Sequence, residues 1–323
     1  MRIPFSRTVQ KLSTEGFSRT LQELSGKSFS QKISALILEL IKFWKVTIKL
    51  AFPPESITVT TNGYKMKISP KQIGIHRELY LYGKREPGVT DFLLKSDILK
   101  KGDVVLDIGA NIGYYAILES KIVGNYGRVY AVEPVENNIK QLQHNLKLNH
   151  TTNVSVSQFA FGSKEGIGKM LITEGCNWST LNPKGVHKVV RTEDVKITTV
   201  DSFLHGKQIP KLIRMDVEGY EHEILKGMPN TLKEGVKLLI EVHGQFLPDL
   251  DSFLELLEKN GYMVRFSVFE NRESYPKIMQ ILSNHSGVPF ANFYTNISIK
   301  KFKEILATNE YIPNTLFERC QAK

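Results

Sequence analysis

The chain has 323 residues, of which 41% are hydrophobic and 24% are charged. This length accommodates one large domain with an extension or two modest domains, and the apolar share excludes disordered and collagen-like proteins. The two cysteines, Cys176 and Cys320, are too few for a disulfide framework or a cysteine-rich zinc site, and indicate a reducing, cytoplasmic environment.

The net charge of +10 is concentrated at the N-terminal end. Residues 1–50 contain nine Lys/Arg and three Asp/Glu, whereas the other 273 residues contain 34 and 30. An enzyme that acts on nucleic acid is expected to spread basic residues over the face that meets the phosphates. The body of this chain is close to neutral, so we expect no nucleic-acid partner.

The basic arm, residues 1–52, contains a predicted amphipathic helix. Residues 1–30 have no apolar core of a signal peptide, so none is predicted. Residues 31–52 place isoleucines, leucines and Trp44 at helical spacing, with lysines and Glu39 on the other face. The five charged residues in this stretch argue against a membrane span. The alternatives are packing on the body or a second subunit, and peripheral contact with an anionic membrane.

The next segment, residues 53–100, begins with a predicted hairpin whose turn is Asn62-Gly63. From residue 101 the pattern alternates between strand and helix. Predicted strands include DVVLDIG, RVYAVEP, NVSVSQFAFG, KLIRMDVEG and VKLLIEVHG, with two more near the C-terminus. This pattern predicts a doubly wound, Rossmann-like α/β sheet over residues 101–303, followed by a tail over 304–323.

The loop after the first of these strands predicts the cofactor. Gly109 and Gly113 allow a ligand to approach the backbone, and Asp107 can receive an ammonium group. Glu133 ends the next strand, 26 residues after Asp107, where a carboxylate can accept both ribose hydroxyls. A dinucleotide site prefers three glycines, and Asp107 would repel a diphosphate. The ligand indicated is S-adenosylmethionine.

The motifs VVLDIGANIGYYAI, VYAVEP, FAFGSKEG, ITTVDSFL, LIRMDVEGYEHEILKGM and LIEVHG occur in the order found in the FkbM family of methyltransferases, which this chain resembles over about residues 85–300. The resemblance implies a class I fold, S-adenosylmethionine as cofactor, and methylation of hydroxyl oxygens on sugars and natural products. The family often has lysine where this chain has Arg214, and a planar guanidinium differs in geometry from an ammonium.

The resemblance also implies roles for residues of the cofactor site. Asp107, Gly109, Asn111 and Gly113 would line the methionine and ribose portion, and Glu133 would bind the ribose. Residues 159–162 end the third strand, where adenine commonly lies. Glu86 matches a recurrent acid of the family and could close over the cofactor.

The predicted catalytic residues are Asp216, Glu218 and His243, which follow the fourth and fifth strands. His243 has the most suitable ordinary pKa for a base that takes the hydroxyl proton, and Asp216 could orient it or bind substrate. Asp216 could instead cap a helix, Glu218 stabilise a helix dipole, and His243 serve a structural role. The three could also hold magnesium, although no spacing demands it, and no metal is predicted.

Residues 163–195 are predicted to form a long specificity loop, in which Trp178 could stack on a sugar. The sequence as a whole favours an O-methyltransferase acting on a hydroxyl of a sugar, glycan or other small metabolite. A nucleic-acid or protein methyltransferase and a non-catalytic S-adenosylmethionine-binding module are the alternatives. The oligomeric state is not indicated.

Overall fold

The computed structural model describes residues 28–175, 177–184, 188–270, 291–308 and 312–319. Cys176, Cys320 and most of the basic arm lie outside these residues. The chain divides into two compact units, one formed by residues 1–54 and 270–292 and the other by 55–269 and 293–323.

The first unit contains helix α2 (Phe29–Ala51), which agrees with the amphipathic helix predicted for residues 31–52. Ser28 and Gln31 form a capping box, each side chain bonding to the other's backbone N–H, so the helix begins at a defined point. Apolar side chains that recur along the helix are 42–59% exposed, namely Ile33, Ile37, Ile41, Trp44 and Ile48. Among the described residues, no helix is long and apolar enough to cross a membrane.

The second unit opens with the predicted hairpin, β1 (Ile57–Thr61) and β2 (Tyr64–Ile68), which pair antiparallel. Asn62 and Gly63 both have positive φ, 46° and 76°, as the tight turn requires. The amide N–H groups of Lys65 and Lys67 donate to Asn149, the C-cap of helix α6 (Glu136–Leu148), and to Asn145 within that helix, so the hairpin is attached to the main domain. Helices α3 (Ile75–Tyr82) and α4 (Pro87–Lys95) follow.

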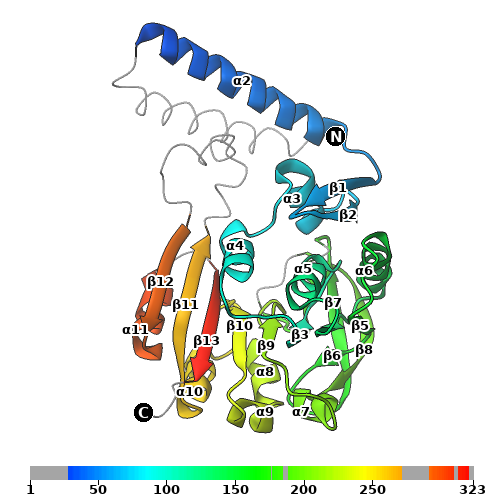
Figure 1. Ribbon diagram of the computed structural model, residues 1–323, viewed down its shortest axis with the longest axis vertical. Coiled ribbons are helices and arrows are strands. Elements are labelled where there is room, and N and C mark those ends of the chain that lie inside the picture. The colour runs from blue at the N-terminus through cyan, green and yellow to red at the C-terminus, as the bar shows by residue number, and fades with distance from the viewer. Residues whose placement is uncertain (1–27, 176, 185–187, 271–290, 309–311, 320–323) are drawn as a thin grey trace. The chain divides into compact units, whose positions relative to one another are not determined.

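The main sheet has eight strands in the order β12-β11-β13-β10-β9-β3-β4-β5 (Figure 1). Their bounds are β3 (Val104–Ile108), β4 (Arg128–Val132), β5 (Val154–Ser157), β9 (Leu212–Met215), β10 (Lys237–Glu241), β11 (Tyr262–Glu270), β12 (Ala291–Ile297) and β13 (Pro313–Arg319). The neighbouring strands β5, β4, β3, β9 and β10 are parallel, and β13 is antiparallel to both of its neighbours. This arrangement confirms the doubly wound α/β class.

Helices connect and cover the sheet. They are α5 (Tyr114–Val123), α7 (Val200–Leu204), α8 (Glu221–Lys226), α9 (Pro229–Lys233), α10 (Leu250–Lys259) and α11 (Ile299–Thr308), in addition to α6. All five residues of β3 are buried, which is typical of a parallel strand covered on both faces. The order in which strands are added to the sheet reverses at β3: β4, its neighbour on one side, follows it directly in the sequence, whereas β9, its neighbour on the other side, comes much later.

Two parts of the sheet arrangement differ from the sequence prediction. The segment NVSVSQFAFG is two strands and not one: β5 joins the main sheet, while β6 (Ala160–Phe161) pairs with β8 (Val189–Thr198). Residues 163–195 are not a long loop, because β7 (Gly166–Thr173) and β8 pair antiparallel over most of this segment. Most of β8 faces solvent and carries charged side chains, so its sequence lacks the apolar run of a buried strand.

The tail predicted for residues 304–323 contains the central strand β13, drawn in red between β10 and β11 in Figure 1. Its first five residues are buried, although Asn314 and Thr315 are polar. The hydroxyls of Thr315 and Ser267 lie 2.9 Å apart and satisfy one another inside the sheet. Because these buried positions are polar, β13 lacks the continuous apolar run by which a buried strand is recognised in a sequence.

Candidate functional site

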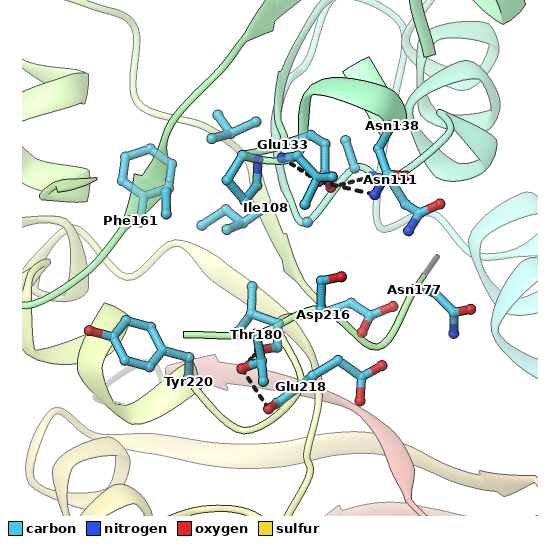
Figure 2. Close-up of a pocket in the computed structure, with 18 of the residues that line it drawn as sticks. Ile108, Asn111, Glu133, Asn138, Phe161, Asn177, Thr180, Asp216, Glu218 and Tyr220 are labelled. Carbon is cyan, nitrogen blue, oxygen red and sulfur yellow. Dashed lines mark hydrogen bonds between the residues drawn. The ribbon is translucent and has the colours of Figure 1, made fainter. Parts of the chain in front are cut away.

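A pocket opens at the carboxyl ends of β3, β4 and β9, where the strand order reverses and ligands of doubly wound sheets bind. It contains about 800 Å³ of space, including its open mouth. Figure 2 shows two groups of side chains facing each other across it. One group contains Ile108, Asn111, Glu133, Asn138 and Phe161, and the other contains Thr180, Asp216, Glu218 and Tyr220.

The turn after β3 brings backbone to the pocket. Gly109, Asn111 and Gly113 all have positive φ, of 81°, 49° and 88°. A Cβ atom on Gly109 would lie 2.0 Å from the backbone oxygen of Asp216, so this position excludes any side chain. Gly109 and Asn111 line the pocket, whereas Gly113 is the N-cap of α5, where an added Cβ would meet Leu142 at 3.2 Å.

Glu133 lies at the end of β4 with its carboxylate held in place (Figure 2). One oxygen accepts the Asn111 N–H at 2.9 Å, and the other accepts the Val135 N–H at 2.9 Å and the Asn138 amide at 3.2 Å. Burial raises the pKa of Glu133 to about 7, against the lowering effect of these donors. The pocket thus presents a fixed carboxyl group whose charge changes near neutral pH.

Asp107, predicted to receive an ammonium group, is fully buried and is not among the residues that line the pocket. Its Oδ1 is 3.3 Å from Nη1 of Arg214. Burial raises the pKa of Asp107, although the guanidinium opposes this. The structure therefore shows Asp107 in contact with Arg214, and its predicted contact with a ligand stays a prediction.

Arg214 bridges two carboxylates with the two arms of its guanidinium. Nη2 lies 3.2 Å from Oδ2 of Asp216, and Nη1 contacts Asp107 as described above. The guanidinium carbon also lies 3.7 Å from the ring centroid of Tyr115. A lysine ammonium could not span both carboxylates and stack on a ring, so the departure from the family's usual lysine has a geometric consequence.

Arg85 and Tyr115 also line the pocket, and neither was predicted from the sequence. Arg85 pairs with Glu86 at 3.0 Å and with Glu78 at 2.9 Å, and lies 3.7 Å from Asp216. The Tyr115 hydroxyl donates to Glu86 at 2.5 Å. Glu86 itself is buried, with φ 41°, so it is tied into the wall of the site by Arg85 and Tyr115. In the sequence, only the prediction that Glu86 lies near the cofactor pointed to its neighbour Arg85.

Asp216 and Glu218 line the pocket in the loop after β9. Asp216 is not a helix cap, because α8 begins only after Tyr220 and has no side-chain cap. Burial alone would raise the pKa of Asp216, but Arg214 and Arg85 hold it well below its usual range. Glu218 has φ 55°, a strained conformation for this residue type, and such strain clusters at functional sites.

His243 lies behind Glu218 and does not line the pocket. Its Nδ1 is 2.7 Å from Glu221 and its Nε2 is 3.1 Å from Glu218. Burial opposes protonation, yet the two glutamates raise the pKa of His243 well above its ordinary value. The three predicted catalytic residues are thus brought together, with the carboxylates facing the pocket and the imidazole buried behind them.

The three-stranded sheet completes the pocket. Phe159, Ala160 and Phe161 line it at the predicted adenine position, whereas Gly162 does not. The Thr180 hydroxyl lies 3.2 and 3.0 Å from the backbone oxygens of Val217 and Glu218, to which it donates. Trp178, predicted to stack on a sugar, does not line the pocket and packs closely over Gly175. Its neighbours Asn177 and Ser179 face the pocket instead.

Comparison with known proteins gives the same assignment as the motifs. Residues 107–264 match the sequence model of the family described as "Methyltransferase FkbM domain". The hexuronic acid methyltransferase AglP of Haloferax volcanii is 29% identical over 148 residues, which are 45% of this chain and 57% of that protein. A protein-L-isoaspartate O-methyltransferase of Ignicoccus hospitalis is 30% identical over 70 residues, 22% of this chain and 33% of its own length.

Among solved structures, a methyltransferase FkbM from Methylobacillus flagellatus KT superposes with a TM-score of 0.40 and 16% identity. The match covers 61% of this chain and 50% of that one. This chain therefore spans only about half the length of the relatives it matches. The match to the FkbM methyltransferase domain thus covers residues 107–264 of this chain and indicates a methyltransferase.

Proposed function

We propose that the protein transfers the methyl group of S-adenosylmethionine to a hydroxyl oxygen of a sugar, glycan or other small metabolite. The observation that carries the proposal is Glu133, a buried carboxyl group oriented by three donors beside the glycine turn of β3. When bound, the cofactor supplies an electrophilic methyl group on a sulfonium, and the chain's own residues must position the acceptor and accommodate its proton.

In this proposal Glu133 accepts hydrogen bonds from the ribose hydroxyls, and Gly109 and Asn111 contact the methionine and ribose portion. Gly113 sets the turn that leads into α5. Asp107 acts through Arg214, which it orients. Phe159 to Phe161 give an apolar surface suited to adenine. These residues fit the cofactor because a hydrogen-bonded carboxyl, open backbone and aromatic surface occur in one pocket.

The acceptor hydroxyl would meet Asp216 and Glu218, across the pocket from Glu133 (Figure 2). Asp216 is held ionised by Arg214 and Arg85, so its pKa is too low for an effective base, and we assign it to binding and orientation. Glu218 is the group that would take up the proton, and His243, which lies 3.1 Å from it, would hold its carboxylate in place. His243 then acts through Glu218 and not by direct contact with the acceptor.

The acceptor class is supported by the Haloferax relative, whose name states hexuronic acid as its substrate. We therefore favour a sugar or glycan acceptor, and propose no nucleic-acid partner.

We also propose that the protein works in the cytoplasm. Because α2 exposes a stripe of apolar side chains, we also propose that it contacts a membrane surface. Co-sedimentation with anionic vesicles tests the membrane contact by comparing the full chain with a chain that lacks residues 1–52. Equal sedimentation of the two would contradict the membrane contact.

Activity is tested by incubating the full chain with methyl-labelled S-adenosylmethionine and a panel of uronic acids, neutral sugars, RNA and protein. The proposal predicts label in a sugar and equimolar S-adenosylhomocysteine, with loss of turnover in Glu218→Gln. Label only in RNA or protein would favour the alternative methyltransferase class. Cofactor binding without transfer to any acceptor would favour a binding module.

A further inference from the structure

The cluster beneath the acceptor side of the pocket has features of a metal site. Each of Asp216, Glu218 and His243 offers a ligand atom, and these atoms all lie within 4.8 Å of one another. In an octahedral site with bonds of about 2.1 Å, neighbouring donors stand about 3.0 Å apart and opposite donors about 4.2 Å. The 3.1 Å between His243 Nε2 and Glu218 Oε2 matches a neighbouring pair, and the whole set requires only a small contraction.

The orientation of His243 is the second, independent observation. The side chain is fully buried, and its Nδ1 lies 2.7 Å from the carboxylate of Glu221. Its Nε2 makes no hydrogen bond of acceptable geometry, although it is directed at the carboxylate of Glu218. A histidine that ligates a metal almost always gives its other ring N–H to a carboxylate or carbonyl, which fixes the tautomer. The pair Glu221–His243 has this arrangement, and leaves Nε2 as the ligand atom.

The charge balance of the cluster favours a cation. Around these side chains the structure gathers five carboxyl groups and two guanidinium groups: Glu86, Asp216, Glu218, Glu221, Glu241, Arg85 and Arg214. Buried charge is costly unless it is compensated. Arg214 and Arg85 already contact Asp216, so they compete with an ion there, but neither contacts Glu218 or Glu221 in the described residues.

We propose that Asp216, Glu218 and His243 bind a divalent first-row cation such as Mn²⁺, with Glu221 orienting the imidazole. Carboxylates suit manganese and magnesium, while the imidazole favours a first-row transition metal over magnesium. Asp216 and Glu218 line the pocket and His243 lies behind them, so the open coordination positions face the acceptor. A second group, Glu86, Asp216 and Glu241, shares Asp216 but contains no histidine, and we assign the ion to the first group.

The chemical role of the ion rests on the proposed function, whereas its binding does not. An acceptor hydroxyl placed on an open position would be acidified, since a bound cation lowers the pKa of a coordinated oxygen acid. In this arrangement His243 serves as a ligand behind the carboxylates, and Asp216 and Glu218 face the acceptor.

The test is a titration of metal-free, full-length protein with Mn²⁺, followed by electron paramagnetic resonance. We expect one equivalent of Mn²⁺ to lose its free-ion signal, and the bound ion to show nitrogen modulation in its spin echo. Affinity should fall at least about 10- to 100-fold in His243→Asn and Glu218→Gln. The control His222→Asn changes a partly exposed histidine of α8 and should bind as the wild type does.

The wild-type echo keeps the proposal falsifiable if the variants fail to fold. Absence of binding, bound Mn²⁺ without nitrogen modulation, or unchanged affinity in folded His243→Asn would each overturn the site. S-adenosylmethionine binding is measured on the same samples by calorimetry. Protein that binds Mn²⁺ but not S-adenosylmethionine would support the metal site and contradict the proposed function. Protein that binds S-adenosylmethionine but not Mn²⁺ would support the cofactor site and contradict the metal site.

Discussion

Replacing Arg214 by lysine tests whether the site depends on a planar bridging cation. The guanidinium contacts Asp107 at 3.3 Å and Asp216 at 3.2 Å through different nitrogens, and lies 3.7 Å from the centroid of the Tyr115 ring. A lysine can retain one ion pair but loses the second and the stacking. The family often has lysine at this position, so family usage suggests that the substitution is tolerated. The contacts of Arg214 in this chain indicate instead that it is destabilising.

The size of the effect follows from the two interactions that a lysine cannot make. One buried hydrogen bond between charged groups contributes about 1.5–3 kcal/mol, and a desolvated cation–π contact about 2 kcal/mol. We therefore expect Arg214→Lys to lower the free energy of unfolding by about 4 kcal/mol. At about 2–4 °C per kcal/mol for a domain of this size, the melting temperature should fall by roughly 8–16 °C.

Urea denaturation followed by circular dichroism measures this change. The control is Arg191→Lys, since Arg191 pairs with Glu193 on the exposed face of β8 and surface pairs contribute little. We expect the control to change stability by less than about 0.5 kcal/mol. If Arg214→Lys costs less than about 1 kcal/mol, a single charge is sufficient and the reasoning from the bridging geometry is refuted.

Three further predictions test the turn, the ribose carboxylate and a buried acid. Gly109→Ala places a methyl group 2.0 Å from the Asp216 backbone oxygen, whereas Gly63→Ala, at similar φ, meets nothing within 4 Å. Urea titration should show a loss of about 1–2 kcal/mol for Gly63→Ala and a clearly larger loss for Gly109→Ala, and equal losses would contradict the clash. Because burial raises the pKa of Glu133 to about 7, the ionised form that best accepts ribose hydroxyls is depleted below that pH. Calorimetry should therefore show cofactor affinity rising with pH through about 7, with a flatter profile in Glu133→Gln; parallel profiles would exclude Glu133 as the titrating group. Glu119 is fully buried with both carboxyl oxygens unbonded, and burial, then Asp107, raises its pKa well above the usual range. The folded chain therefore keeps a proton that the unfolded chain releases above its ordinary pKa of 4.5, so this group lowers stability as pH rises. The free energy of unfolding, measured by denaturation at pH 5 and at pH 8, should fall less between these two pH values in Glu119→Met than in wild type. An equal fall in both proteins would show that Glu119 does not titrate as described.

The sequence predicted the parts of the fold that rest on local patterns. The hairpin follows from Asn62-Gly63, the strands β3, β4, β9 and β10 from apolar runs, and α2 from helical periodicity. Strand β13 was missed because Asn314 and Thr315 are polar yet buried, and their partners are distant in sequence. Pairing between remote segments is not encoded in a local window.

For the site, the sequence predicted which loops meet but not how the side chains pair. Glu133, Asp216 and Glu218 line one pocket because parallel strands end at one edge of the sheet. Arg85 lies before the predicted domain of residues 101–303, and although its neighbour Glu86 was expected near the cofactor, the sequence did not indicate that Arg85 would contact Asp216. The raised pKa of His243 could not be inferred either, since it depends on Glu218 and also on Glu221, for which the sequence suggested no role.

The central claim is that the pocket beside Glu133 binds S-adenosylmethionine, and calorimetric titration of the full chain tests it most directly. The ligands are S-adenosylmethionine, S-adenosylhomocysteine and NAD, and the variants are Glu133→Ala and the exposed control Glu136→Ala. We predict that both sulfur ligands bind and NAD does not. Loss of charged hydrogen bonds of about 1.5–3 kcal/mol should weaken binding about 10- to 150-fold in Glu133→Ala only. Folded protein that binds neither sulfur ligand, or binds them equally well without Glu133, would contradict the account.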